Sequence, residues 1–402
     1  MPLLQPPDSG AGVHSSNEEE AVTSEERRKA RYERRVQQRA EKKKRRQKWA
    51  DDFKRVFSYG GLYYAYKCCR CGVSWKASVQ RYIALAPLQV YRTWKRLQEG
   101  KFRSPGFFEF ILRERGKIRY IRSTVIGERV VQRCLCDRAL VPMLQRSFIY
   151  DNGASMVNKG YDFAMRRLER HLHEHYRKHG QEGYVLLFDF SKFFDNVSHQ
   201  VLEEILRGAF TDERIIGITM HFVKMFGEKG LGLGSQISQV LALASANRLD
   251  HLIKEKLRIH GYGRYMDDGY LIHRSKAYLQ KCLQEIRKMC ETLGIVLNEK
   301  KTQIVKLSHG FTWLKARFLL TESGRVVRRI YKRSVTVMRR KLKTFRRKLD
   351  EGQMRFQDVE TAWRSWRGYA EKFDAWHTRQ RLGSLYDQLF ITDWRNERCI
   401  AS

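Results

Sequence analysis

The chain has 402 residues, 42% of them hydrophobic and 12% aromatic, so it is long enough to bury more than one core. It carries 79 Lys and Arg against 44 Asp and Glu, a formal net charge of +35. Such an excess favours a nucleic-acid partner, because each basic group set against a phosphate releases counterions. An anionic membrane is the weaker alternative, since no run approaches the roughly 18 consecutive apolar residues of a spanning helix. We therefore expect no membrane association and a soluble, cytoplasmic protein.

The N-terminal region divides by composition into a tail and a basic arm. Residues 1–24 are rich in Pro, Gly, Ser and acidic residues, which predicts a disordered tail. Residues 25–50 begin EERRKARYERRVQQRAEKKKRRQK, which predicts an exposed helix with too little amphipathicity for a core role. We interpret this helix as a nucleic-acid arm, and the alternative is an ordinary solvated face.

A hairpin and a helix are predicted within residues 51–180. The text FFEFILRERGKIRYI indicates two strands joined by a turn at Glu114 to Gly116, with Lys117 and Arg119 on the second strand. The text that follows, ERVVQRCLCDRALVPML, has helical spacing. A basic hairpin before a helix suits a phosphate clamp, and the alternative is a surface hairpin with solvated charges.

The eight cysteines do not indicate a disulfide scaffold in a chain of this length. Cys68, Cys69 and Cys71 in KCCRCG, with Cys134 and Cys136 in RCLCD, lack the second half of a zinc finger. We expect reduced structural thiols, with metal binding at the first cluster as the open alternative.

Three carboxylates follow or interrupt the strongest apolar strands, which lie within residues 181–310. Asp189 ends YVLLFD, and Asp267 and Asp268 interrupt YGRYMDDGYLI where a hairpin turn fits. If these strands are neighbours, the carboxylates converge and require cations between them, and hard divalent ions suit oxygen ligands. Two Mg²⁺ ions about 3.5 to 4 Å apart, or Mn²⁺ in their place, would stabilise an in-line phosphoryl displacement. The sequence therefore predicts nucleotidyl transfer.

After about residue 325 the chain is predicted to be helical and basic. Met338, Leu342, Phe345 and Leu349 recur at helical spacing, so this stripe is expected to be buried with the basic faces free. A second repeat of aromatic residues is expected to pack rather than to stack on bases, and it comprises Trp363, Trp366, Tyr369, Phe373 and Trp376.

The blocks FDFSKFFDN, LGSQISQ, YMDD, LNEKKT and FTWLKARF occur in the order and spacing of reverse transcriptase motifs, over residues about 100 to 320. The chain resembles bacterial-type reverse transcriptases, similar to those of group II introns, retrons and diversity-generating retroelements. The resemblance implies an α+β right-hand polymerase with an antiparallel palm sheet plus helices, mixed fingers and a helical thumb. Its parts would be fingers with the start of the palm (51–180), palm (181–310), and primer grip with thumb (311–402).

The resemblance also implies roles for the acidic centre. Asp189 and Asp267 would be metal ligands, with Asp268 assisting beside them and the backbone carbonyl of Phe190 as a further ligand. Lys301 would protonate the leaving pyrophosphate, a role that its positive charge suits.

The remaining implied residues surround the nucleotide and the primer. Phe194 matches the bulky gate that excludes a ribose 2′-hydroxyl, and Leu233 and Gly234 would lie beside the nucleotide. Lys117 and Arg119 match the cations that hold the triphosphate. The primer grip would comprise Trp313, Leu314 and Lys315, with Lys315 in place of the glycine common in relatives.

The implied partners are an RNA template, a DNA or RNA primer, the RNA/DNA duplex and deoxynucleoside triphosphates. A cognate structured RNA would dock on the basic arm, and the enzyme would be bacterial, with nucleoid association as one possible location. Only 84 residues follow Phe318, so neither a ribonuclease H nor an endonuclease domain is expected.

One block departs from the common text. Many relatives have Gln-Gly, three residues, Ser-Pro, whereas this chain has Leu233-Gly234 and Ser238-Gln239. The departure resembles the diversity-generating type, which copies adenine with errors, because a lost amide removes a hydrogen bond that penalises wrong geometry. An antiphage defence enzyme and a group II intron-like element are alternatives. A non-catalytic RNA-binding protein is the alternative of another class, and the bulky Phe194 argues against an RNA-templated RNA polymerase.

Overall fold

The computed structural model describes residues 23–114 and 117–400, and the chain divides into two units, residues 1–48 and 49–402. The first unit contains one long helix, α1 (Ser24–Ala50), whose last two residues belong to the second unit. The predicted disordered tail lies outside the described residues apart from its last two positions.

Helix α1 begins at a capping box. The Glu26 carboxylate accepts the Thr23 amide at 2.7 Å, and the Thr23 hydroxyl accepts the Glu26 amide at 3.3 Å. Two backbone donors that the helix leaves unpaired are thereby satisfied. The side chains of residues 24–42 are all exposed, as predicted for a solvated basic helix.

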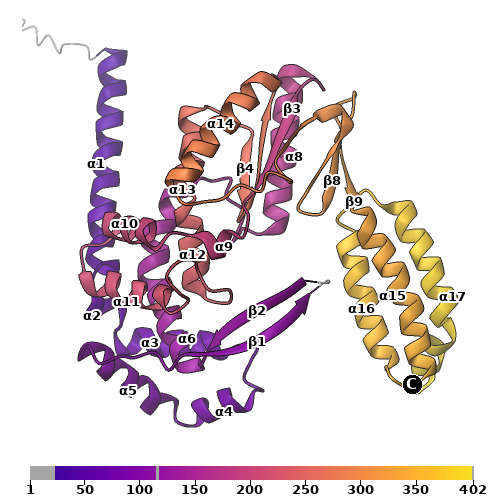
Figure 1. Cartoon of the computed structure of the whole chain (residues 1–402), viewed down its shortest axis with the longest axis horizontal. Coiled ribbons are helices and arrows are strands. Elements are labelled where there is room, and N and C mark those ends of the chain that lie inside the picture. Colours follow the sequence, from indigo (N-terminus) through magenta and orange to yellow (C-terminus); the bar gives the residue numbers. More distant parts are fainter. Residues whose placement is uncertain (1–22, 115–116, 401–402) are drawn as a thin grey trace, which may run out of the picture. The chain divides into compact units, whose positions relative to one another are not determined.

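The second unit opens with helices and a two-stranded hairpin (Figure 1). The first helices are α2 (Phe53–Val56), α3 (Tyr59–Arg70), α4 (Ala77–Ala84) and α5 (Ala86–Gln98). The hairpin pairs β1 (Phe107–Glu114) with β2 (Lys117–Thr124) antiparallel, and α6 (Ile126–Leu135), a π-helical turn (Cys136–Leu140), α7 (Val141–Leu144) and a 3-10 turn (Gln145–Ser147) follow. The predicted hairpin and helix are confirmed, while the tip of the predicted turn, residues 115–116, lies outside the described residues.

A four-stranded antiparallel sheet, with the order β4-β5-β3-β6, carries the predicted acidic residues. Its strands are β3 (Tyr184–Asp189), β4 (Tyr262–Tyr265), β5 (Asp268–His273) and β6 (Gln303–Lys306). Successive side chains of β3 alternate between two cores, with Leu186 and Phe188 in one and Val185 and Leu187 in the other. Both faces of the sheet are therefore buried, which is why its strands read as continuous apolar runs.

Helices cover each face of this sheet. Helix α14 (Lys276–Thr292) contributes Leu279 and Ile286 to the first core, and α8 (Tyr161–His179) contributes Met165 and Leu172 to the second. The helices between β3 and β4 are α9 (Phe193–Asn196), α10 (His199–Ala209), α11 (Glu213–Lys224), α12 (Gln236–Ser245) and α13 (Asn247–His251), continued by a π-helical turn (Leu252–Lys256).

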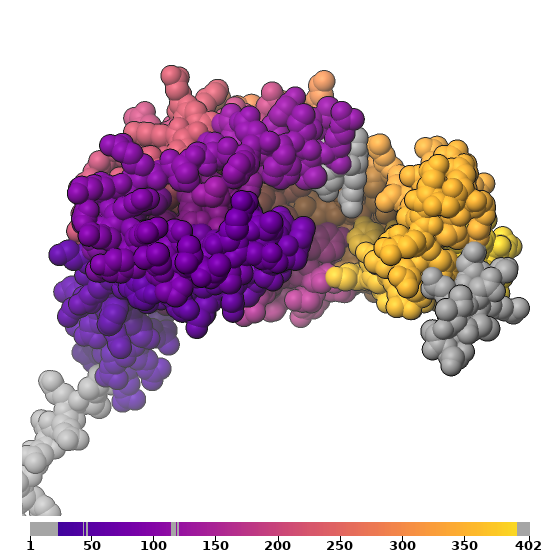
Figure 2. Space-filling view, turned by 90° about the horizontal axis from the view of Figure 1, so that it is seen from below, coloured from indigo at the N-terminus to yellow at the C-terminus, as the bar shows by residue number. Residues whose placement is uncertain are grey.

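The C-terminal part is a small sheet followed by a helical bundle. The sheet contains β7 (Phe311–Trp313), β8 (Ala316–Leu320) and β9 (Val326–Ile330), preceded by a 3-10 turn (Leu307–His309). The bundle contains α15 (Lys332–Asp350), α16 (Phe356–Ala370) and α17 (Trp376–Ile400), and it has its own core. Figure 2 shows this orange-to-yellow bundle beside the purple N-terminal helices and hairpin, with a recess between the two.

The predicted apolar stripe of α15 is confirmed, since Met338 and Leu342 are buried and Phe345 and Leu349 pack partly buried against them. The aromatic repeat is only partly as expected. Trp363 stacks on Tyr386 at 4.8 Å within the bundle core, but Trp376 is 59% exposed. The expectation was wrong for Trp376 because α16 ends at Ala370 and α17 begins at Trp376, so the helical spacing does not continue across the break.

Candidate active site at the end of the four-stranded sheet

The structure brings the three predicted aspartates together at one end of the sheet. Asp189 is the last residue of β3 and lies directly opposite Asp268, the first residue of β5. Asp267 lies in the two-residue turn between β4 and β5, and its carbonyl accepts the amide of Phe190 at 3.1 Å. The apolar strands thus end in carboxylates at the same edge.

A buried ion pair holds the turn before these carboxylates. Arg264, fully buried, donates to both carboxylate oxygens of Asp250, at 2.8 and 2.6 Å, and its Nη1 donates to the Met266 carbonyl at 2.7 Å. Met266 has a left-handed backbone with φ of 55°, which is unfavourable for a residue with a side chain. Tyr262 also donates to Asp250, at 2.6 Å. Sequence reasoning missed this anchor, although an arginine within the apolar text YGRYMDD was a signal for it.

Two side chains from the segment before β6 neutralise and orient Asp189. Lys301 forms a 2.8 Å ion pair with the Asp189 carboxylate, and the Asn298 amide donates to the same oxygen at 3.2 Å. The Asn298 backbone amide also donates to the Asp189 carbonyl at 2.8 Å. Lys301 was predicted from its motif, whereas Asn298 was not. Both residues lie in the turn formed by residues 298–302, and the strand β6 begins only at Gln303.

The electrostatics of the cluster reflect crowded acids in a buried place. Burial, with the negative charge of Asp189, raises the pKa of Asp267. Burial, followed by the charges of Asp267 and Asp189, raises the pKa of Asp268 further. The hydrogen bond to Asp189 raises the pKa of Lys301, which stays protonated. The site is therefore one in which additional positive charge is strongly favoured.

The cluster fits a divalent cation by the chemistry of its donors, although its side chains are not gathered into a ready-made metal cage. Among the described residues, no group of three or more His, Cys, Asp or Glu side chains could hold a metal ion as it stands. Instead, one carboxylate oxygen of Asp189 forms the ion pair with Lys301. Phe190 and Leu297 form an isolated antiparallel bridge. Its hydrogen bonds are made by the residues on either side of them, so the Phe190 carbonyl takes part in none of these bonds. Carboxylate and carbonyl oxygens are the donors that Mg²⁺ prefers.

The LGSQISQ segment forms a turn and the start of α12. Ser235 is the N-cap, accepting the Ser238 amide at 3.4 Å and donating to buried Gln132 at 3.0 Å. Gly234 has φ of +104°, and a Cβ there would lie 3.5 Å from the Arg122 carbonyl of β2. Leu233 is half-buried beside it. The segment thus joins the hairpin to α12, which begins at Gln236.

Phe194 is tied by backbone to the same loop. It lies in α9, and its carbonyl accepts the Leu231 amide at 2.6 Å. Lys192, which precedes α9, has a left-handed backbone with φ of 44° and turns the chain sharply after Asp189. A backbone hydrogen bond therefore links the predicted gate residue to the loop that leads to Leu233.

The predicted triphosphate ligands lie on β2, where Lys117 pairs with Glu114 and Arg119 with Leu112. The side chains of both basic residues lie outside the described part of the structure. The base of the hairpin is fixed instead by Phe107, whose ring stacks on Phe226 at 4.7 Å.

The predicted primer-grip residues form the turn between β7 and β8. Leu314 and Lys315 both have left-handed backbones, with φ of 45° and 63°, so the chain keeps a glycine-like conformation where Lys315 replaces the usual glycine. Trp313 is buried and packs edge-to-face on Tyr270 at 4.8 Å. Trp313 is therefore a core residue of this turn, and Lys315 is the exposed one.

The described cysteines of the two predicted clusters differ in burial. Cys134 and Cys136 are buried, and burial raises the pKa of Cys69 to about 11. Cys69 lies near the Arg129 carbonyl at 3.6 Å, and Cys71 is exposed. A raised pKa disfavours the thiolate that metal binding requires.

Comparison with known proteins identifies the family. A family model described as reverse transcriptase (RNA-dependent DNA polymerase) matches residues 111–319, just over half of the chain. The chain belongs to the reverse transcriptase family. The resemblance read from the sequence is confirmed, and so is the α+β class of a right-hand polymerase.

Individual relatives are distant. Protein YkfC of Escherichia coli (strain K12) is 23% identical over 257 residues, which are 53% of this chain and 66% of that protein. A telomerase from Candida albicans, solved with a fragment of telomeric RNA, has a TM-score of 0.45 and 13% identity over 62% of this chain and 51% of its own. An apo telomerase from Candida tropicalis has a TM-score of 0.42 and 14% identity over 61% and 53%. The chain thus spans about half to two thirds of the length of these three proteins.

No helix in the described part of this reverse transcriptase combines the length and the apolar character needed to cross a membrane.

Proposed function

We propose that the chain is an RNA-directed DNA polymerase that makes cDNA by metal-dependent nucleotidyl transfer at Asp189, Asp267 and Asp268. The observation that carries the proposal is the cross-strand pair of Asp189 and Asp268 with Asp267 in the adjoining turn, inside the segment that matches the reverse transcriptase family. A non-catalytic binding protein would have no need to gather a buried and two half-buried acids beside one another, since doing so is unfavourable without cations.

Asp189 and Asp267, with Asp268 and the Phe190 carbonyl beside them, are the residues that would hold two Mg²⁺ ions or Mn²⁺. The bound ions would favour deprotonation of the primer 3′-hydroxyl and stabilise the charge on the triphosphate. Lys301, held at 2.8 Å from Asp189, would donate its proton to the departing pyrophosphate oxygen.

The nucleotide would lie between the aspartates and the hairpin. The hydrogen bond from the Leu231 amide holds the Phe194 backbone, and the Phe194 ring packs edge-to-face on Phe193, which supports a ring position that would exclude a 2′-hydroxyl and so favour deoxynucleotides. Gly234 would allow close approach of the backbone to the nucleotide. Lys117 and Arg119 would hold the triphosphate.

The RNA/DNA duplex would lie in the recess of Figure 2. Three parts of the polymerase would surround it: the fingers with the start of the palm (51–180), the palm (181–310), and the primer grip with the thumb (311–402). Basic α15 would face the duplex backbone, which is read by shape and charge rather than by sequence. Lys315, in the turn between β7 and β8, would contact the primer.

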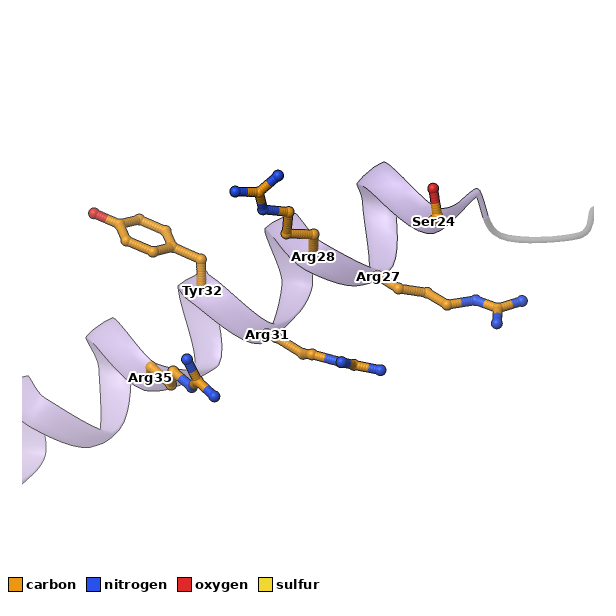
Figure 3. Close-up of a pocket in the computed structure, with 6 residues that line it drawn as sticks. All are labelled: Ser24, Arg27, Arg28, Arg31, Tyr32 and Arg35. Carbon is orange, nitrogen blue, oxygen red and sulfur yellow. The ribbon is translucent and has the colours of Figure 1, made fainter. Parts of the chain in front are cut away.

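A structured RNA would dock on the basic arm of residues 25–50. Figure 3 shows Arg27, Arg28, Arg31 and Arg35 projecting from α1 in several directions with Tyr32 among them. This surface belongs to one helix and is open to solvent, which suits a polyanion better than a small molecule.

The activity test uses purified protein with poly(rA)/oligo(dT), Mg²⁺ and dTTP. We expect incorporation that depends on the divalent ion, prefers deoxynucleotides and is lost in Asp267→Asn. The control Asp195→Asn changes an acid that lies outside the cluster, so incorporation should continue. Synthesis that survives Asp267→Asn, or a preference for ribonucleotides, would contradict the proposal.

We further propose that copying is error-prone at template adenine, as in diversity-generating retroelements. The reason is that Leu233 does not place a side-chain amide beside the nucleotide, as a glutamine would. Leu233→Gln should reduce misincorporation opposite adenine, measured by sequencing cDNA from a defined template. Gln236→Ala is the matched control, since that amide lies in the same segment but outside the departure and already donates a hydrogen bond to Asp137 at 3.3 Å. An unchanged error spectrum would count against this subtype. A template and variable repeat pair near the coding sequence would support it, whereas a defence island or an intron boundary would favour those systems.

A further inference from the structure

A second polar cavity lies at the other end of the four-stranded sheet. It has a volume of about 240 Å³ and is lined by α8, the segment before β4 and the end of β5. His273, which lines it, pairs across the sheet with Tyr184, whereas Asp268 pairs with Asp189. At roughly 3.3 Å per residue, five residues of strand separate the two places by about 17 Å. This cavity is therefore distinct from the acidic site.

Five histidines line the cavity: His171, His175, His179, His260 and His273. The His175 Nε2 bonds to the Glu182 carbonyl at 2.7 Å, so this nitrogen carries the ring proton. His273 accepts the Ser275 amide at Nδ1, at 3.0 Å, so its neutral ring carries the proton at Nε2. His273 thus keeps a donor for a ligand, and burial lowers the pKa of both His175 and His273, which favours their neutral rings.

Three further cations surround the histidines without acidic partners. Among the residues that the structure describes, none forms an ion pair or hydrogen bond with the side chains of Lys178, Arg258 or Arg274, all of which line the cavity and are exposed. Glu174 is the one acid in the lining, and Arg170 pairs with it at 2.9 Å from outside the cavity. The cavity therefore holds an excess of positive charge.

A metal ion does not suit this set of side chains. No group of His, Cys, Asp or Glu in the described ranges could hold a metal as arranged, and three lysine or arginine charges would repel a cation. An anion with several oxygen acceptors suits it well, because the guanidinium groups and the Nε2–H of His273 donate to such oxygens at fixed angles. The cavity is smaller than the roughly 300 Å³ of the smallest drug-sized sites, which favours a phosphate or diphosphate group.

We propose that this cavity, formed by α8, residues 258–261 and the end of β5, binds a phosphate group, either on a free anion or at the end of an RNA. Arg258 and Arg274 would supply the charge and His273 a directed donor. The proposal does not depend on polymerase activity, because no residue of the acidic site takes part.

Binding is measured by titration calorimetry of the full chain with inorganic phosphate and with pyrophosphate, in EDTA so that divalent ions do not contribute. The double variant Arg258→Ala, Arg274→Ala should bind pyrophosphate roughly tenfold or more weakly, since charge-assisted hydrogen bonds are lost. The matched control is the double variant Arg177→Ala, Lys276→Ala, which removes the same charge from exposed positions outside the cavity. It should bind as the unchanged protein does.

The source of the phosphate is tested with one RNA oligonucleotide carrying either a 5′-phosphate or a 5′-hydroxyl. Tighter binding of the phosphorylated form, lost in the cavity variant and kept in the control, would assign the cavity to an RNA end. Binding of pyrophosphate without such discrimination would assign it to a free anion. Equal pyrophosphate affinity in the cavity variant, the control and the unchanged protein would overturn the proposal. Circular dichroism checks that both variants are folded.

Discussion

The guanidinium of Arg264 connects the interior of the protein to the acidic turn. It is fully buried, its charge is balanced by Asp250, and its Nη1 donates to the Met266 carbonyl at 2.7 Å, one residue before Asp267. A planar group with fixed donors can perform both tasks at once, whereas an ammonium acts as a point charge. We infer that Arg264 positions the turn in addition to stabilising the core.

Arg264→Lys should lower kcat at least about tenfold while nucleotide KM changes little, because the charge is kept but the grip on the Met266 carbonyl is lost. Arg264→Met should instead unfold the protein more readily, since an unpaired buried carboxylate costs about 3 to 5 kcal/mol. Steady-state kinetics and thermal unfolding separate these effects.

The control removes the whole polar group together, as Arg264→Met, Asp250→Leu and Tyr262→Phe. This triple variant should recover much of the stability lost in Arg264→Met but not the kcat, because nothing then holds the Met266 carbonyl. A triple variant with normal kcat would reduce Arg264 to a purely structural residue.

At the scale of elements, one of the contacts that join the hairpin of β1 and β2 to the body of the protein is made by the Phe226 ring. A Cβ at Gly232 would lie 1.8 Å from the Phe226 ring, which stacks on Phe107 at the base of the hairpin. Arg122 of β2 also donates to the Phe226 carbonyl, at 3.1 Å. The absence of a side chain at Gly232 therefore sets the position of the ring that supports the hairpin.

Gly232→Ala should displace the Phe226 ring and lower the free energy of unfolding by about 1 to 3 kcal/mol, as for other overpacked sites. The hairpin should also become more sensitive to trypsin. Gly208→Ala is the control, because an added Cβ there meets nothing within 4 Å and the residue lies inside α10. Its substitution should be neutral or stabilising. Equal unfolding curves for the two variants would show that the ring moves without consequence.

The elements with strong local signals could be predicted from the sequence. The apolar runs ending in Asp189 and interrupted by Asp267 and Asp268 gave the strands, and their shared edge followed from antiparallel pairing. The partners of those residues could not be predicted. Arg264 and Asp250 belong to different elements, and Ser235 donates to Gln132, 103 residues away. Trp376 was misjudged because helical spacing was continued across a break that the sequence does not mark with proline.

At the scale of the whole molecule, the basic charge is distributed over separate parts, which would contact nucleic acid in different ways under the proposed function. The arm of residues 25–50 has exposed side chains on all sides in its first four turns, whereas the basic residues of α15 share their helix with a buried stripe. Residues 49–402 form a compact unit without the first 48. Affinity for RNA and the capacity for synthesis are therefore expected to be separable.

Deletion of residues 1–48 should weaken binding of structured RNA and make it less dependent on salt, because fewer phosphates are neutralised. Synthesis on poly(rA)/oligo(dT) should be retained. The measurements are RNA affinity over a series of salt concentrations and primer extension. A full-length variant with four arginines replaced by Gln keeps the helix, and its RNA affinity should lie between that of the unchanged protein and that of the deletion variant. The four are Arg27, Arg28, Arg31 and Arg35. Unchanged RNA affinity after the deletion would remove the arm from the proposed RNA interface.

The alternation of β3 between two cores limits how this protein can change in length. Adding or deleting a single residue within β3 or β5 would exchange the side chains facing each core and turn Asp189 away from Asp268, so that packing and the acidic pair would fail together. A change of two residues would restore the facing but displace the carboxylate along the strand. Natural variation in length should therefore accumulate in the connections between elements. The number of residues between Asp189 and Asp267 is free to vary, but the position of Asp189 relative to β3 and that of Asp267 relative to β5 are not.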